Sequence, residues 1–228
     1  MLKSVHNHSE TCRWRRRKEA RPGEIMDAAL ELFAERGYAA TRLTEVAARA
    51  GISKGTLYLY FDSKEALFQA VIREMMVPLM ESAERQAGDF TGDTTDLLRD
   101  MSSFWVDCIM NSRLSAVPKL IVSEAGNFPE LARYYNDQII RRGTRLAMRI
   151  LERGIERGEF NDCDVRHVAH VIIAPMVFCA IWQHSLAQID PDAFEIEPYF
   201  AAHLDVVLHG LKGTTTDTAE DKTSSNRQ

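Results

Sequence analysis

The chain has 228 residues, 45% of them apolar and 27% charged, which is the composition of an ordinary soluble globular protein with one core or two small ones. Its longest apolar stretch, residues 171–182, is too short to span a bilayer, and no apolar run at the N-terminus indicates a secretory signal. The net charge of −5 argues against a nucleic-acid partner, but residues 1–63 carry 11 Lys and Arg against 8 Asp and Glu, so a basic end adjoins an acidic remainder.

Residues 1–21 form a basic segment that contains the run CRWRRRKEAR. The segment lacks helical periodicity, so we expect a disordered, solvated arm. A second interpretation is an arm that contacts phosphates or enters a minor groove, as the arms of other DNA-binding folds do. His6, His8 and Cys12 are types of metal ligand, but no fourth ligand accompanies them, so no metal is predicted here.

A helix is predicted from near Pro22 to Arg36. Proline is tolerated at the first position of a helix, and Gly37 is suited to end one. The helix has an apolar stripe that predicts one wall of a small helical domain, formed by Ile25, Ala28, Ala29, Leu32 and Phe33.

Residues 41–64, TRLTEVAARAGISKGTLYLYFDSK, predict two short helices joined by a tight turn. Gly51 supplies the turn, because glycine adopts a left-handed conformation without a steric penalty. Ser53 is a good N-cap for the second helix, since its hydroxyl accepts an unpaired backbone N–H. The small side chains of Ala47 and Ala50 let the helices cross closely, as a helix-turn-helix requires. The second helix of such a motif enters the major groove with its N-terminal residues first.

This stretch resembles the DNA-binding domain of the TetR/AcrR family of transcriptional regulators. The resemblance covers roughly residues 22–70 and rests on many positions at fixed offsets: Ala28, Ala29, Leu32, Phe33, Gly37, Tyr38, Thr41, Val46, Ala47, Ala50, Gly51, Ile52, Ser53, Gly55, Leu57, Tyr58, Tyr60, Phe61, Lys64 and Leu67. The rest of the chain resembles the family only in being helical and of suitable length. The resemblance implies a homodimeric repressor that binds a palindromic DNA operator without a cofactor and releases it when a small molecule occupies the C-terminal domain.

The resemblance, with outward or terminal positions on the two motif helices, also indicates the residues expected at the DNA. They are Arg42, Thr44, Ser53, Lys54, Gly55, Thr56, Tyr58, Tyr60 and Lys64. Among them, Lys54, Gly55 and Thr56 are expected to face base edges. Phosphate contacts are expected from Thr44, Tyr58, Tyr60 and Lys64.

A long helix is predicted to begin at Lys64, capped by Asp62 or Ser63. Pro78 falls inside its apolar pattern and must remove one backbone hydrogen bond, which predicts a kink. Because this helix begins at the DNA-binding part and ends in the apolar part of the chain, we expect it to be the lever between the two.

Further helices are expected over roughly residues 95–111, in a short piece that ends at 124–127, from Pro129 to about 157, from Asp162 or Asp164 to about 188, and over roughly 198–211. GDFTGDTT at 88–95 is a break, residues 191–198 are a loop, and the segment after Gly213 has no apolar content to bury and should be disordered. No strand pattern is found, so the predicted fold class is all-α. Its predicted parts are an arm (1–21), a three-helix DNA-binding domain (22–68), a helical effector-binding and dimerisation domain (69–212) and a tail (213–228).

Two side-chain patterns favour ordinary structural roles. Arginines recur every four residues at 141, 145, 149, 153 and 157, with Arg142 beside them, but each step of four turns about 40° round a helix. This row predicts a solvated, ion-paired face rather than an anion site. Cys163, His167 and His170 share a helical face, but no further ligand completes a metal site.

Other chemistry is absent from the sequence. There is no GxSxG, HExxH or P-loop motif and no triad spacing, so an enzyme is not predicted. The four cysteines, Cys12, Cys108, Cys163 and Cys179, form no CxxC pair and no disulfide framework, which fits a reducing cytoplasm.

Methionines and aromatic residues recur through the middle helices. Such residues at helical spacing are usually core, but a soft, adaptable lining also suits a pocket for an apolar effector, as the resemblance implies. The expected effector contacts are Met75, Met76, Phe104, Trp105, Cys108, Met176 and Cys179.

The last two helices are apolar on more than one face, so they are candidates for a four-helix bundle between two subunits. A dimer also explains how one short helix achieves specificity, since it reads two half-sites. Three alternatives to a repressor remain open. The first is a transcriptional activator, the second is a DNA-binding adaptor regulated by another protein, and the third is an enzyme or carrier formed by the helical C-terminal domain.

Overall fold

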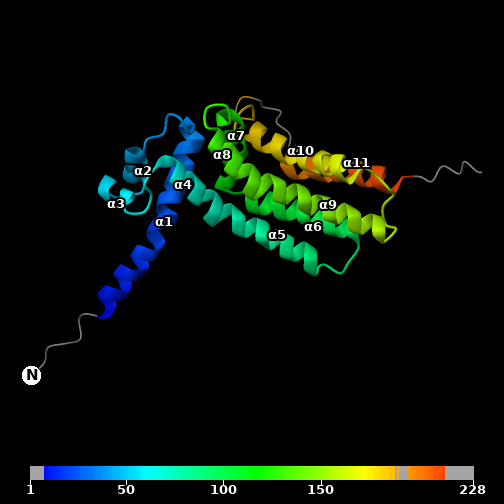
Figure 1. Ribbon diagram of the computed structural model, residues 1–228, viewed down its shortest axis with the longest axis horizontal. Coiled ribbons are helices and arrows are strands. Elements are labelled where there is room, and N and C mark those ends of the chain that lie inside the picture. Colours follow the sequence, from blue (N-terminus) through cyan, green and yellow to red (C-terminus); the bar gives the residue numbers. More distant parts are fainter. Residues whose placement is uncertain (1–7, 188, 190–194, 214–228) are drawn as a thin grey trace, which may run out of the picture.

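The computed structural model describes residues 8–187, 189 and 195–213, with side chains from residue 21 onward. All regular elements in these ranges are helices, which confirms the all-α class. Figure 1 shows a small head, α1 to α4, at one end of an elongated helical bundle. Residues 1–7 of the predicted arm and residues 214–228 of the predicted tail lie outside the described residues.

The head contains α1 (His8–Arg36), α2 (Leu43–Arg49), α3 (Lys54–Tyr58) and α4 (Lys64–Val71). The predicted start of the first helix at Pro22 is wrong, because α1 begins at His8 and runs through this proline. A proline inside a helix removes one backbone hydrogen bond and crowds the carbonyl four residues earlier, but in α1 the helix continues on both sides of Pro22.

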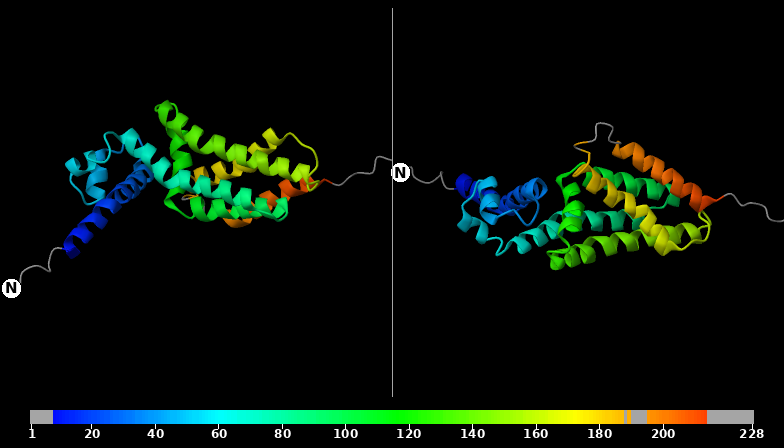
Figure 2. Two further views of the ribbon diagram at one scale, coloured as in Figure 1. Left: turned by 60° about the horizontal axis from the view of Figure 1, so that its bottom comes forward. Right: turned by 90° about the horizontal axis from the view of Figure 1, so that it is seen from above.

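The bundle consists of α5 (Val77–Asp89), α6 (Thr94–Trp105), α9 (Arg141–Glu156), α10 (Val165–Gln183) and α11 (Ile196–Lys212). These helices lie lengthwise beside one another, as the views in Figure 2 show. The short helices α7 (Ala116–Glu124) and α8 (Pro129–Tyr135) connect the bundle to the head, because α7 packs on α1 and α8 packs on α4.

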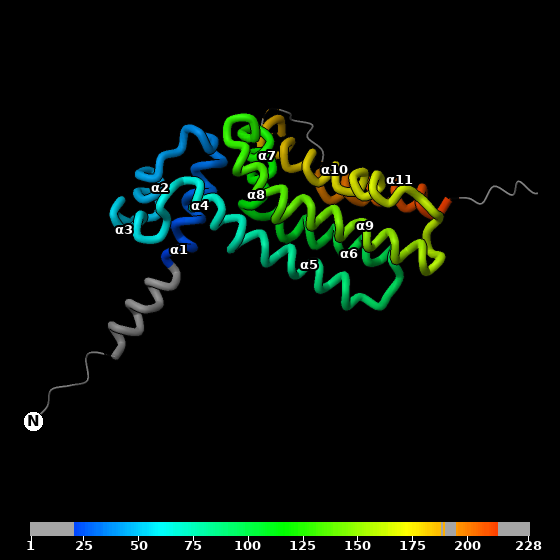
Figure 3. The backbone as a smooth tube through the Cα atoms, viewed as in Figure 1, coloured from blue at the N-terminus to red at the C-terminus, as the bar shows by residue number. Residues whose placement is uncertain are grey.

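Three π-helical turns interrupt what the sequence predicts as continuous helices: η1 (Ile72–Met76), η2 (Val106–Met110) and η4 (Asn136–Ile140). In η1 the N–H of Val77 donates to the carbonyl of Ile72, five residues earlier. The irregularity in the long helix therefore lies immediately before Pro78, and α4, η1 and α5 continue as one path through it (Figure 3).

One apolar core is shared by the head and the short connecting helices. Tyr38 and Phe68 of the head are fully buried against Leu131 of α8 and Val117 of α7, and the Tyr38 ring centroid lies 4.9 Å from that of Phe128. A second core fills the bundle between α5, α6, α9, α10 and α11. The head is therefore held against α7 and α8 by buried apolar contacts, in addition to its covalent link to the bundle through α4.

The arginine row on α9 is more than a solvated face. Arg142 forms a two-point ion pair with Glu84 on α5, with a shortest distance of 2.6 Å. The Arg153 guanidinium donates to the carbonyl of Gly92 at 2.7 Å and to the hydroxyl of Thr94 at 3.0 Å. For these two residues the predicted solvated role is wrong, because they tie α9 to α5 and to the turn before α6.

Candidate DNA-binding surface and effector cavity

The turn between α2 and α3 has the geometry that the sequence predicts. Gly51 has φ of +65°, in the left-handed region that favours glycine. The hydroxyl oxygen of Ser53 accepts a hydrogen bond from the N–H of Thr56 at 3.1 Å, so Ser53 caps α3. The two hydroxyl oxygens of these residues are also 2.8 Å apart.

The exposed side of α3 carries basic and aromatic side chains. Lys54 and Gly55 are exposed, and Tyr58 retains 42% of its accessible surface with its ring centroid 5.7 Å from the Lys54 ammonium. Leu57 is fully buried on the opposite side. This surface is suited to a duplex, and the base and phosphate contacts expected from it stay predictions.

The start of α2 is capped from within the helix. The Glu45 carboxylate accepts a hydrogen bond from the backbone N–H of Arg42 at 3.1 Å and an ion pair from Arg36 at 2.8 Å. The side chains of Arg42 and Thr44 are thereby left exposed beside α3. Tyr60 differs from them, since it is half-buried against the head core.

Lys64, which is expected to contact a phosphate, makes hydrogen bonds within the head. Its ammonium donates to the carbonyl oxygens of Tyr38, Ala39 and Thr41 at 2.6, 3.1 and 3.0 Å. A lysine ammonium has three N–H donors, and these three acceptors use all of them. In this geometry Lys64 holds the loop after α1, and its expected contact to the DNA backbone stays a prediction.

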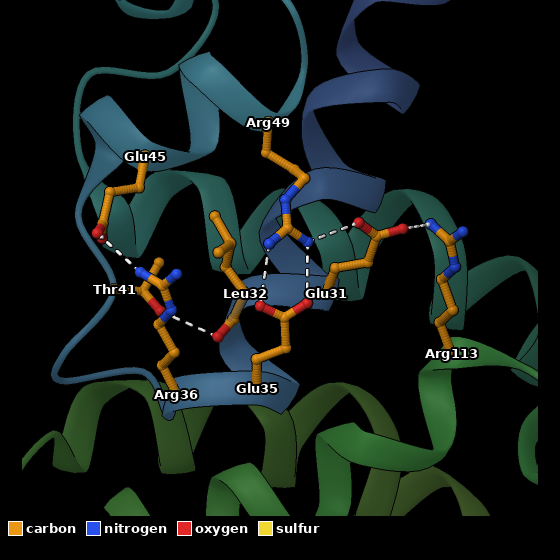
Figure 4. Close-up of polar contacts among 8 residues, drawn as sticks. All are labelled: Glu31, Leu32, Glu35, Arg36, Thr41, Glu45, Arg49 and Arg113. Atoms are coloured by element: carbon orange, nitrogen blue, oxygen red, sulfur yellow. Dashed lines mark hydrogen bonds and ion pairs between the residues drawn. The ribbon is translucent and has the colours of Figure 1, made fainter.

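Figure 4 shows a network of charged side chains that joins the head to the bundle side of the chain. Arg49 of α2 donates to Glu35 and Glu31 of α1 at 2.9 and 3.0 Å. Glu31 also pairs at 2.6 Å with Arg113, which lies in the short 3-10 turn η3 (Arg113–Ser115) that follows η2. All of these side chains remain partly exposed, so the network contributes orientation more than stability.

An apolar cavity of about 220 Å³ lies inside the bundle. Its walls come from η1, α5, α6, η2, α7, α8, η4, α9, α10 and α11, and almost all of its lining is hydrocarbon. Each of the three π turns contributes to it, through Met76, Ile109 and the pair Ile139 and Ile140. An apolar space between helices with few polar groups is the usual character of a site for a small apolar ligand.

The structure brings four of the seven expected effector residues to this cavity: Met76, Phe104, Trp105 and Met176. Met75 and Cys108 instead line an open groove beside η3, and Cys179 is buried in a separate small cluster with Phe200. Met75 faces away because it is adjacent to Met76 on a helical turn, and neighbours in sequence do not share a face.

The sequence analysis missed polar residues of the cavity. Ser102, Tyr135 and His203 all line it. Burial raises the pKa of the Tyr135 phenol, so the hydroxyl stays neutral. A signal for the other two is visible in the sequence: each interrupts an apolar helical stripe, Ser102 between Leu98 and Trp105, and His203 beside Phe200.

Among the residues whose side chains are described, no group of three or more His, Cys, Asp and Glu lies together as a metal site would require. His167 pairs with Asp164 at 2.7 Å, and His170 contacts the carbonyl of Arg166 at 2.7 Å. Of the three N-terminal candidates, His6 lies outside the described residues, as do the side chains of His8 and Cys12.

Two family profiles match the chain. The profile described as bacterial regulatory proteins, tetR family, matches residues 25–71, and that of the tetracyclin repressor-like C-terminal domain matches residues 85–195. The HTH-type transcriptional regulator YfiR of Bacillus subtilis (strain 168) is 30% identical over 155 residues, which are 63% of this chain and 69% of YfiR.

Two further similarities concern proteins named for fatty acids. The fatty acid metabolism regulator protein of Bacillus subtilis (strain 168) is 29% identical over 158 residues, which are 68% of this chain and 80% of that protein. The solved structure of the regulator FadR from Bacillus subtilis in complex with stearoyl-CoA superposes with a TM-score of 0.69 at 24% identity, over 82% of this chain and 98% of FadR. The superposition on FadR shows that the two proteins share a fold.

Proposed function

Because this chain belongs to the TetR family of bacterial regulatory proteins, we propose that it is a transcriptional repressor that binds a palindromic operator as a homodimer and releases it when a small apolar effector enters the bundle. Its relatives are named transcriptional regulators, so the chain is a regulator of transcription and not an enzyme. It acts in the cytoplasm, where the DNA lies.

The single observation that carries the proposal is the combination of an exposed helix-turn-helix with an apolar cavity in the same chain. Lys54, Gly55 and Thr56 meet base edges in the major groove, and Thr44 and Tyr58 meet phosphates. Ser53 and Arg42 lie at the starts of α3 and α2, where backbone N–H groups face an anionic backbone.

The effector is an apolar molecule of modest size. Hydrocarbon lines the cavity, and the relatives named for fatty acids make an acyl chain a suitable body for it. The present volume of about 220 Å³ is below the usual range of ligand sites, so a long chain would have to widen the bundle. Widening would displace α5 and hence α4, which continues from α5 into the head.

The dimer uses the outer faces of α10 and α11. Val171 and Phe178 of α10 are 55% and 43% exposed, and Val206 of α11 is 74% exposed. Among the described helices, α10 is the one long and apolar enough to cross a membrane. Only 28% of the apolar stretch of α10 is buried within the chain. A second subunit that packs on these faces would cover the apolar surface in a four-helix bundle.

The test is operator release measured by fluorescence anisotropy with a medium-chain alcohol or fatty acid as the effector. Met176→Ala should raise the effector concentration needed for release about tenfold, with operator affinity in the absence of effector unchanged. Met75→Ala is the matched control, since this methionine lies outside the cavity. If both variants respond equally, or if no apolar compound releases the operator, the proposed effector site is wrong.

A further inference from the structure

The cavity contains one polar atom that is buried and has no hydrogen-bond partner among the described residues. It is Nε2 of His203, on the inner face of α11. Buried polar atoms in folded proteins are nearly always paired, and one left unpaired costs free energy. An unpaired nitrogen that faces a ligand-sized apolar space indicates that the partner comes from the ligand.

The protonation of the His203 ring can be worked out from its surroundings. Burial lowers its pKa, and a hydrogen bond to the backbone of Ile172 on α10 acts in the opposite direction. Since that bond favours the protonated ring, the backbone group is the carbonyl, which can only accept. Because Nε2 has no partner, the nitrogen that faces Ile172 is Nδ1, and it carries the proton. In the neutral ring Nε2 then keeps its lone pair and accepts.

Ser102 lies level with His203 on the neighbouring helix. Arg99 of α6 pairs with Asp205 of α11 at 3.5 Å, and the ring of Trp105, six residues further along α6, lies 5.2 Å from Phe200 of α11. The residue numbers rise along α6 as they fall along α11, so the two helices run antiparallel. Ser102 is midway between the two contacts on α6, which places it opposite residues 202 and 203.

Together the two side chains offer a hydroxyl that donates and accepts and an imidazole nitrogen that accepts. Hydrocarbon surrounds them, so water competes little for these groups once a ligand fills the cavity. A ligand with only a carbonyl or an ether oxygen can pair with the serine but leaves His203 unpaired. A hydroxyl, carboxylic acid or primary amide satisfies both.

We propose that Ser102 and His203 bind the polar group of the effector, which is an apolar molecule whose one buried group both donates and accepts a hydrogen bond. The proposal rests on the cavity being the effector site and adds the chemical class of the effector to it. Sites that hydrogen-bond a substrate hydroxyl discriminate strongly against analogues that lack it, because the protein group is then left unpaired.

The experiment compares two isomers of equal size, 1-octanol and heptyl methyl ether, by isothermal titration calorimetry on the full chain. The wild type should bind the alcohol about tenfold more tightly than the ether. His203→Leu should bring this ratio close to one, mainly by weakening the alcohol, and Ser102→Ala should reduce it in part. His209→Leu, at an exposed histidine on the same helix, should leave the ratio unchanged.

The outcomes separate this proposal from the one it rests on. If neither isomer binds the wild type, the effector cavity itself is wrong. If both bind equally well, the cavity is an effector site but Ser102 and His203 do not bind a polar group. A preference for the alcohol that survives in a folded His203→Leu variant, as judged by its thermal unfolding, would also overturn the assignment.

Discussion

At the scale of single residues, Lys64 illustrates how a lysine in a DNA-binding head serves the fold. Its ammonium lies 4.3 Å from the centroid of the buried Tyr38 ring and bonds three carbonyls of the loop that follows α1. Burial lowers the pKa of this lysine, because partial removal of the ammonium from water disfavours the charged form. The three carbonyls take the place of the lost water and hold the ammonium within the head.

We expect Lys64→Met to lower the free energy of unfolding by about 1–3 kcal/mol, because the three partly buried carbonyls of the loop lose a charged donor. Lys54→Met, at an exposed position on α3, should leave stability unchanged and should weaken operator binding with a shallower salt dependence. Urea unfolding and anisotropy over a salt series measure both quantities. If Lys64→Met is as stable as the wild type but its operator binding depends less steeply on salt, Lys64 contacts a phosphate in the wild-type complex.

At the scale of elements, the three π turns all border the apolar cavity that we propose as the effector site. A π turn carries one residue more than the helix around it, and such turns recur at functional sites. Because η1, η2 and η4 lie in three different helices and meet at one space, their packing leaves room there that regular helices would have filled. Pro78, just after η1, prevents the long helix from closing into a regular ladder.

A second consequence at this scale concerns Glu159, in the turn between α9 and α10. Hydrogen bonds from Thr94, first from its hydroxyl and then from its backbone N–H at 2.5 Å, together with Arg157, hold the pKa of this carboxyl at about 2. A carboxyl with a depressed pKa stabilises the fold above its unfolded pKa of 4.5, and this stabilisation is lost as the pH falls towards 2.

Glu159→Gln should therefore lower the free energy of unfolding by about 1 kcal/mol at pH 7, because the start of α6 loses a charged acceptor. The difference from wild type should shrink as the pH is lowered from 4.5 towards 3. Urea titrations across this range measure it, with Glu156→Gln on the exposed end of α9 as the control. A difference that stays constant with pH would contradict the role of the carboxylate charge.

The same scale shows which features could be predicted from sequence. The helix-turn-helix could be predicted because its signals are local: Gly51 for the turn and Ser53 for the cap act within a few residues. The π turns could not be predicted, since no residue type marks the place of the extra residue in a helix. The residues of the cavity could be predicted only in part, because its walls come from segments far apart in the chain. His203 illustrates this, since its unpaired nitrogen becomes evident only when α6 and α10 are in place.

At the scale of the whole molecule, the exposed apolar faces of α10 and α11 set the expected assembly. Val206→Glu should convert the proposed dimer to a monomer, because a carboxylate in the proposed apolar interface loses its water without gaining a partner. Operator affinity should fall by 100-fold or more, in order of magnitude, since a monomer reads one half-site. Analytical ultracentrifugation and anisotropy measure the two effects.

Val122→Glu provides the matched control, because this valine is 59% exposed on α7, outside the two helices proposed to form the interface. It should remain dimeric and bind the operator normally. A Val206→Glu protein that stays dimeric would assign the interface to another surface.

The core shared by the head with α7 and α8 has a consequence for building hybrid regulators. Grafting residues 22–68 from another regulator would set a foreign surface against Val117, Leu131 and Phe128, and would remove the partner of Arg113. Such a hybrid gains the operator specificity of the donor, but the mismatched core can abolish its response to the effector. A hybrid that also carries residues 113–135 from the donor keeps the contacts of the head with α7 and α8 within one parent. The new boundary then falls between α7 and α10, which pack on each other, so those two surfaces must match instead.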